Sequence, residues 1–184
     1  FPVMRVKPLI AIPLIAVALA GCSAQQPAPK ETAAAADQKP LFASDEEALA
    51  AAQAAYANYL EVSDQIARDG GANPERLKRL VSDALYSEQL SAYKELQSSG
   101  IHAGGSTAMD HFRIQDFSNV ASNGAFTTYV CLDVSSNPVL DSEGKDVTPS
   151  DRQSRIPLSI SFIGEGSKGL IINSSEVWTG TNFC

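Results

Sequence analysis

The spacing of apolar residues changes part-way along this chain of 184 residues. Before Gly100, apolar side chains recur every three or four positions, as they do on one face of an α-helix. After Gly105, they alternate with polar or small residues, as in a half-buried β-strand. Helices followed by strands are typical of an α+β domain, in which the helices pack on one face of an antiparallel sheet.

Three helices are expected in the first half of the chain. Residues 44–47 (Ser-Asp-Glu-Glu) form a capping-box pattern that opens the longest helix, and residues 69–71 (Asp-Gly-Gly) should end it. Asn73 before Pro74 predicts the N-cap of a second helix. A third helix is expected from about Ser87 to Gln97. One face of the second helix would carry Leu77, Leu80, Val81, Ala84 and Leu85.

Four strands are expected in the second half, near residues 111–120, 125–135, 156–162 and 170–178. Asn123-Gly124 is a strong signal for a two-residue hairpin between the first two strands. Residues 141–144 and 164–169 supply two further turns, because both segments are rich in glycine and polar residues.

The first 21 residues have the three parts of an export signal. Arg5 and Lys7 form a positive end, an apolar run extends from Leu9 to Ala20, and small residues come last. The run is shorter than the roughly 20 residues that a membrane-spanning helix needs, so cleavage is expected. The signal would be complete if it began at Met4, without the residues before it.

The end of this segment, Leu19-Ala20-Gly21-Cys22, resembles the lipobox of bacterial lipoproteins. The resemblance implies that the Cys22 thiol receives a diacylglyceryl group and becomes the first residue of the mature chain. The protein would then be anchored in the cell membrane on its extracytoplasmic face, because two or three acyl chains give lasting attachment. An ordinary secretory signal with an incidental cysteine is the alternative.

The segment from Cys22 to residue 43 is expected to be a lipidated cysteine with a flexible tether. Residues 23–40 contain no aromatic residue and no Val, Ile, Leu or Met, so they cannot bury enough apolar surface to fold. A short alanine-rich helix is the alternative.

A single domain is expected over residues 44–184. The formal net charge of −7 makes the chain a poor candidate for binding nucleic acid.

The cysteine count agrees with an exported protein. Three cysteines leave one pair, Cys131 and Cys184, if Cys22 carries lipid. Exported proteins commonly oxidise such pairs, so we expect a disulfide. Two reduced, buried cysteines are the alternative.

The order of elements, with a long first helix, two shorter ones and a curved antiparallel sheet, resembles the nuclear transport factor 2-like (NTF2-like) cone fold. The segments TTYVCLDVSSNPVLDSEGKDVT, RIPLSISF and SSEVWTGTNFC are similar to a group of small actinobacterial lipoproteins. The most specific shared feature is the cysteine of VCLDVS, paired with a C-terminal cysteine that follows a tryptophan strand. The resemblance covers about residues 44–184 and implies a fold and a location, without an assigned activity.

An enzyme with an acid–base pocket inside the cone is the competing hypothesis. Isomerase-like and cyclase-like members of the wider superfamily use a pocket carboxylate as the base. The groups that could serve here are Tyr56, Tyr59, Asp110, Asp116 and Asp133. None of them matches a catalytic motif of those enzymes, so no catalytic residue and no cofactor is assigned.

Neither histidine predicts a metal site. His102 and His111 lack a partner at metal-ligand spacing, and zinc needs three or four ligands, so both are expected to be surface or capping residues. The Gly104-Gly105-Ser106-Thr107 segment is interpreted as a turn rather than an anion-binding loop, because a strand follows it.

Trp178 invites two interpretations. It is expected to cover one end of the sheet beside the disulfide, with a recognition hot spot as the alternative. Tyr129 should share the sheet face of Cys131, because the strand period is two. The sequence therefore predicts a lipid-anchored envelope protein that binds another protein or a small apolar molecule. A filled inner sheet face would favour this prediction, whereas an open one lined by a carboxylate would favour the enzyme. A structural or assembly role in an envelope complex is the third hypothesis.

Overall fold

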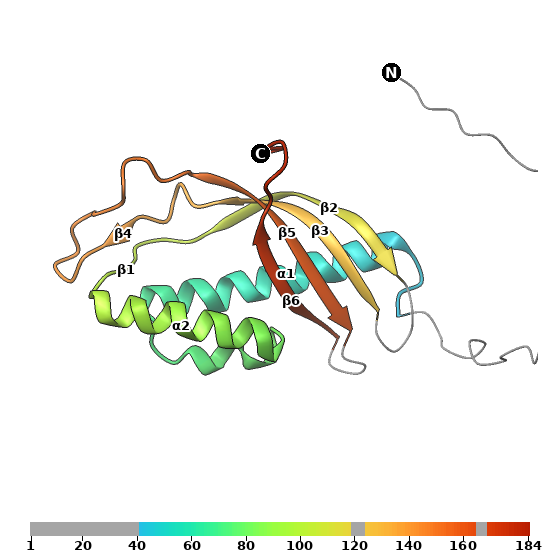
Figure 1. Cartoon of the computed structure of the whole chain (residues 1–184), viewed down its shortest axis with the longest axis horizontal. Coiled ribbons are helices and arrows are strands. Elements are labelled where there is room, and N and C mark those ends of the chain that lie inside the picture. The colour runs from blue at the N-terminus through green and yellow to red at the C-terminus, as the bar shows by residue number, and fades with distance from the viewer. Residues whose placement is uncertain (1–40, 119–123, 165–168) are drawn as a thin grey trace, which may run out of the picture. The chain divides into compact units, whose positions relative to one another are not determined.

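A computed structural model describes residues 41–118, 124–164 and 169–184, which belong to one compact unit of the chain. Helices form one layer and an antiparallel sheet forms the other (Figure 1). The predicted α+β class is confirmed. Cys22, the expected signal and most of the expected tether lie outside the described residues. No helix in the described ranges has both the length and the apolar character that crossing a membrane requires.

The first helix, α1 (Asp45–Arg68), begins and ends where the sequence predicts. The Ser44 hydroxyl accepts a hydrogen bond from the backbone N–H of Glu47 at 3.2 Å, so the N-cap of the predicted capping box is present. At the other end, Gly70 has a φ of +63°, in the left-handed region that glycine adopts without strain. The N–H groups of Gly70 and Gly71 bond back to carbonyls of the last turn, as in a Schellman motif.

The second expected helix is a short 3-10 helix, η1 (Pro74–Arg79). Asn73 precedes it in the left-handed conformation, with a φ of 55°, and its side chain makes no capping hydrogen bond. Asn73 therefore occupies the predicted N-cap position, but without the side-chain hydrogen bond that usually caps a helix. Pro74 at the first position does match the prediction, because the fixed φ of proline suits a helix start.

The helix breaks after η1 because Val81 pairs with the sheet. Val81 forms a parallel bridge to Ile172, whose N–H and C=O bond to the neighbours of Val81 at 2.9 and 2.8 Å. Ser82 then caps α2 (Asp83–Ser99), which starts before the expected Ser87. The five apolar residues expected on one helical face are thus divided among η1, the bridge and α2.

The main sheet contains four antiparallel strands in the order β2-β3-β5-β6, with these bounds: β2 (Ala108–Ser118), β3 (Ala125–Asp133), β5 (Arg155–Gly164) and β6 (Leu170–Val177). All four strands were predicted within a few residues. A separate two-stranded sheet, β1 (His102–Ala103) with β4 (Val139–Leu140), was not, because two residues are too few to establish a period.

Of the three predicted turns, the one at residues 141–144 is present, since the Gly144 N–H bonds to the Asp141 carbonyl at 3.0 Å. The Asn123-Gly124 turn and the turn at residues 164–169 fall largely outside the described residues.

The core lies between the helices and the inner face of the sheet, which is the face toward α1 and α2. Val130, Ile160, Phe162 and Ile172 are completely buried there. Phe162 stacks on Phe126 with ring centroids 5.3 Å apart. Aromatic and branched side chains therefore fill the inner face of the sheet.

The outer face of the sheet points away from the helices and is partly covered by the residues after β6 (Figure 1). Cys131 and Cys184 form a disulfide with their Cα atoms 5.5 Å apart. Trp178 and Phe183 contact the Tyr129 ring at centroid distances of 4.9 and 5.4 Å. Tyr129 and Cys131 thus share one face, and Trp178 packs over the sheet as the packing interpretation predicts.

Candidate functional site

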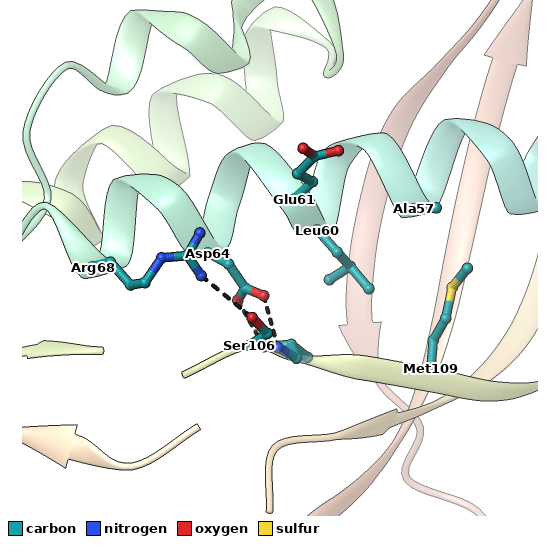
Figure 2. A pocket seen from close by; sticks show the side chains of 8 residues that line it. Ala57, Leu60, Glu61, Asp64, Arg68, Ser106 and Met109 are labelled. Carbon is teal, nitrogen blue, oxygen red and sulfur yellow. Dashed lines mark hydrogen bonds between the residues drawn. The ribbon is translucent and has the colours of Figure 1, made fainter. Parts of the chain in front are cut away.

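A hollow of about 270 Å³ lies between α1 and the start of β2 (Figure 2). Asp64 accepts hydrogen bonds from the Thr107 N–H and the Thr107 hydroxyl, both at 2.7 Å. Arg68 donates to the Gly105 carbonyl at 2.9 Å. These contacts fasten the 104–107 turn to α1, so the side chains of Asp64, Arg68 and Thr107 already have partners within the chain. The interpretation of residues 104–107 as a turn agrees with this arrangement.

A larger cavity of about 680 Å³ lies beside η1 and the paired ends of β5 and β6. We call it the basic groove and define it by its lining residues, which come from three segments: Lys78 and Arg79, residues 81–83, and Ile163 with Ile171. Its volume is in the range of pockets that bind small molecules or short chain segments.

The walls of the basic groove combine apolar and cationic groups. Val81 and Ile171 are 2% and 5% exposed, so they give it an apolar wall. Lys78 and Arg79 are exposed, and neither forms an ion pair with a carboxylate of the described residues. The Lys78 ammonium lies 5.3 Å from the centroid of the Tyr86 ring. Asp83 is the one acidic residue among the described lining residues.

Long-range pairing builds the basic groove. Ile163 and Ile171 are partners in the β5–β6 ladder, and the Val81–Ile172 bridge brings the end of η1 against them. Sequence analysis missed this site because its halves are far apart along the chain. The Lys78-Arg79 pair before an apolar dipeptide was the only local signal.

Two of the carboxylates considered for acid–base chemistry, Asp110 and Asp133, lie on the outer face. Both oxygens of Asp110 accept hydrogen bonds from Arg155, at 2.7 and 2.8 Å, and Asp133 accepts another at 3.0 Å. The hydrogen bonds from Arg155, followed by those from His111, hold the pKa of Asp110 below its ordinary value. Hydrogen bonds from Ser135 do the same for the pKa of Asp133. Both groups are therefore ionised at neutral pH and engaged in ion pairs.

The two tyrosines of the enzymatic hypothesis lie on the opposite side of the sheet. Tyr56 is 1% exposed and stacks on Tyr59, with ring centroids 5.5 Å apart. Burial raises the pKa of both hydroxyls. The structure therefore does not bring the tyrosines together with Asp110 or Asp133. The backbone of Asp116 pairs with Thr127 in the β2–β3 ladder, and its side chain lies outside the described residues.

The two histidines lie in different surroundings. His102 lies half-buried on β1. His111 is exposed on β2 with a φ of 51°, and its Nδ1 lies 2.5 Å from a carboxylate oxygen of Asp110. Asp110, His111 and Cys131 offer ligand atoms that all lie within 4.8 Å of one another. This proximity was not predicted, because it depends on the register of β2 against β3.

No family model matches this chain, and no curated protein sequence matches it. Among solved structures, it is similar to the intermembrane space region of the chloroplast protein ARC6, with a TM-score of 0.52 and 8% sequence identity. The similarity covers 70% of this chain and 95% of that one. At this identity, the similarity concerns the fold alone.

Proposed function

We propose that this chain is a lipid-anchored protein of the cell envelope whose NTF2-like domain is a non-catalytic binding module. The basic groove is the binding surface, and an acidic, extended segment of a partner protein is its occupant. The observation that carries the proposal is the pairing of two exposed cations, Lys78 and Arg79, with a buried apolar wall in a chain of net charge −7.

The anchor is supported by the sequence around Cys22. A positive end, an apolar run and a lipobox-like motif occur in the order that an export signal requires. The NTF2-like assignment is supported by the element order, with a long helix, two shorter helical segments and a four-stranded antiparallel sheet.

Charge favours an acidic occupant. The net negative charge of the chain repels acidic proteins. Lys78 and Arg79 have no carboxylate partner among the described residues, so they would attract an acidic segment to this site and fix its orientation. Carboxylates of the partner would lie near Lys78 and Arg79, and an apolar side chain between them would contact Val81 and Ile171.

The filled inner face favours binding over acid–base catalysis. Phe126, Phe162 and Ile160 occupy the space that a catalytic cone would leave open. Asp64, the carboxylate between α1 and β2, is already engaged by Thr107.

Peptide titration followed by amide NMR shifts tests the proposal. The probes are the acidic hexapeptide Glu-Glu-Leu-Val-Glu-Glu, with blocked ends, and a control in which lysine replaces each glutamate. We expect the acidic peptide alone to shift the amides of Val81, Ile163 and Ile171. The affinity should fall with rising salt, because exposed ion pairs are screened.

A double variant, Lys78→Glu with Arg79→Glu, should weaken this binding by about tenfold or more, because two attractive pairs of up to about 1 kcal/mol each become repulsive. Lys94→Glu with Lys145→Glu makes the same change in net charge at exposed positions outside the groove and should have little effect. Equal weakening by both double variants, or shifts confined to other surfaces, would disprove the groove as the binding site.

A further inference from the structure

The disulfide lies beside two other potential metal ligands on the outer face. Asp110 is the register partner of Cys131 across the β2–β3 ladder, and His111 follows it. Ligand atoms of Asp110, His111 and Cys131 lie within 4.8 Å of one another. Cys184 lies outside that group of three but is bonded to Cys131, with the Cα atoms of the two cysteines 5.5 Å apart.

We propose that reduction of the Cys131–Cys184 disulfide creates a zinc site whose ligands are Asp110, His111, Cys131 and Cys184. In the oxidised protein, both sulfur atoms are used by the disulfide. After reduction, two thiolates, one imidazole and one carboxylate give a complete tetrahedral set of the ligand types that zinc binds in proteins. The disulfide therefore blocks a latent metal site.

The chemistry balances with a dithiol as the reductant. The dithiol supplies two electrons and two protons, the S–S bond of the protein breaks, and the dithiol itself becomes a disulfide. Zinc then displaces the two thiol protons and forms two Zn–S bonds, so metal binding releases two protons to the solvent.

The geometry requires only side-chain movement. Ligand atoms on a tetrahedral zinc ion lie roughly 3.3–3.8 Å apart, given Zn–N and Zn–S bonds of about 2.0 and 2.3 Å. For Asp110, His111 and Cys131, contraction from the present separation of up to 4.8 Å is within the reach of side-chain rotation, because His111 and Asp110 are both exposed. The Cys184 sulfur is not part of that group and would have to turn toward the other ligands once its bond to Cys131 is reduced. The φ of 51° at His111 accompanies a register shift in β2, which places two consecutive residues, Asp110 and His111, near Cys131.

The surrounding charges also fit. Two thiolates and the Asp110 carboxylate carry three negative charges, which zinc neutralises in part. Arg155, which donates to Asp110 at 2.7 Å, supplies a further positive charge. When Asp110 turns toward the metal, Arg155 keeps Asp133 as its partner, at 3.0 Å. No buried charge is left without a partner.

Metal titration of the full-length chain tests the proposal. The chain should carry Cys22→Ser, so that Cys131 and Cys184 supply all the thiols. The protein is reduced with a phosphine, desalted without oxygen and titrated with Zn²⁺ against a chromophoric chelator. We expect one equivalent to bind to the reduced protein and none to the oxidised protein. Co²⁺ in place of Zn²⁺ should give thiolate charge-transfer bands and the intense visible bands of a tetrahedral site.

The two histidines provide a matched pair of variants. His111→Ala should weaken zinc binding at least about tenfold, because even an outer-shell partner of a metal contributes that much. His102→Ala should bind as the parent does. Equal affinity of the parent and His111→Ala, or no binding to the reduced protein, would overturn the proposal.

Thermal unfolding provides a second test, which still applies if reduction of the disulfide destabilises the domain. Zinc should raise the Tm of the reduced parent and of reduced His102→Ala, since a ligand that binds the folded state stabilises it. It should raise the Tm of reduced His111→Ala by clearly less and leave the Tm of the oxidised parent unchanged. A Tm that rises equally in both histidine variants would contradict the site.

Discussion

At the scale of single residues, Asp64 is the most consequential polar group that sequence analysis overlooked. It occupies a position on the buried face of α1, four residues after Leu60, and is 8% exposed. Its carboxylate receives two hydrogen bonds from Thr107 and a longer one, 3.4 Å, from Asn137. One side chain thus connects α1 to the turn before β2 and to the segment before β4.

Replacing Asp64 by Ala should lower the free energy of unfolding by about 1–3 kcal/mol, because the Thr107 N–H and hydroxyl would lose their charged acceptor in a partly buried setting. Urea denaturation of the purified domain measures the change. Glu61→Ala is the matched control, since Glu61 is exposed on the same helix and such surface changes are usually within about 0.5 kcal/mol. If both variants lose the same stability, Asp64 has no special role in fastening the turn.

At the scale of elements, sequence prediction succeeded where the determining interactions are local. The capping residues of α1 and the Gly70-Gly71 ending act within one helical turn, and the alternation in β3 and β5 spans a single strand. It failed between residues 79 and 83, where a helical pattern of apolar residues is interrupted by pairing with β6. The spacing of apolar residues gives no sign of this interruption, because the partner of Val81, Ile172, is far away in the sequence.

The same reason explains which parts of the sites could be predicted. The cysteine pair followed from a count of cysteines, since exported chains oxidise them. The basic groove and the proximity of His111 to Cys131 depend on strand register and on the bridge to Ile172, which no local pattern specifies.

The junction between α1 and η1 is predicted to be intolerant of a side chain at Gly71. Gly71 has a φ of +89°, and a Cβ there would collide with the Tyr93 carbonyl oxygen on α2. Gly71→Ala should therefore destabilise the domain by more than the roughly 1–2 kcal/mol that a left-handed alanine costs by itself.

Gly100→Ala isolates that conformational cost. Gly100 also has a positive φ, +70°, but a Cβ at this position has nothing within 4 Å. Chemical denaturation of both variants should rank Gly71→Ala clearly below Gly100→Ala. Equal losses would show that α1 and α2 can separate at this point without cost.

At the scale of the whole molecule, the disulfide adds a covalent link to a small core. The disulfide joins β3 to the end of the chain across 53 positions, and it fixes the residues that cover the outer face. The proposed lipid on Cys22 would act at the opposite end of the chain. The lipid would then hold the folded domain near the membrane, and the disulfide would fix the C-terminal residues to β3.

Cys22→Ala is expected to move the protein expressed in a bacterial host from the detergent phase to the aqueous phase in Triton X-114 partitioning, because the acyl chains would have no attachment point. Ser23→Ala changes the neighbouring residue and should leave the partitioning as it is. Persistence of Cys22→Ala in the detergent phase would refute the lipid anchor.

The bridge between Val81 and Ile172 also imposes an order in time. Ser82 and Asn173, which share a hydrogen bond beside that bridge, are separated by 91 positions. A growing chain can form α1 and α2 early, but closing so long a loop is slow and must wait until β6 has emerged. The basic groove is built on that closure. A chain that lacks β6 would thus have no basic groove, so recognition of a partner through the proposed site would report that β6 has joined the sheet.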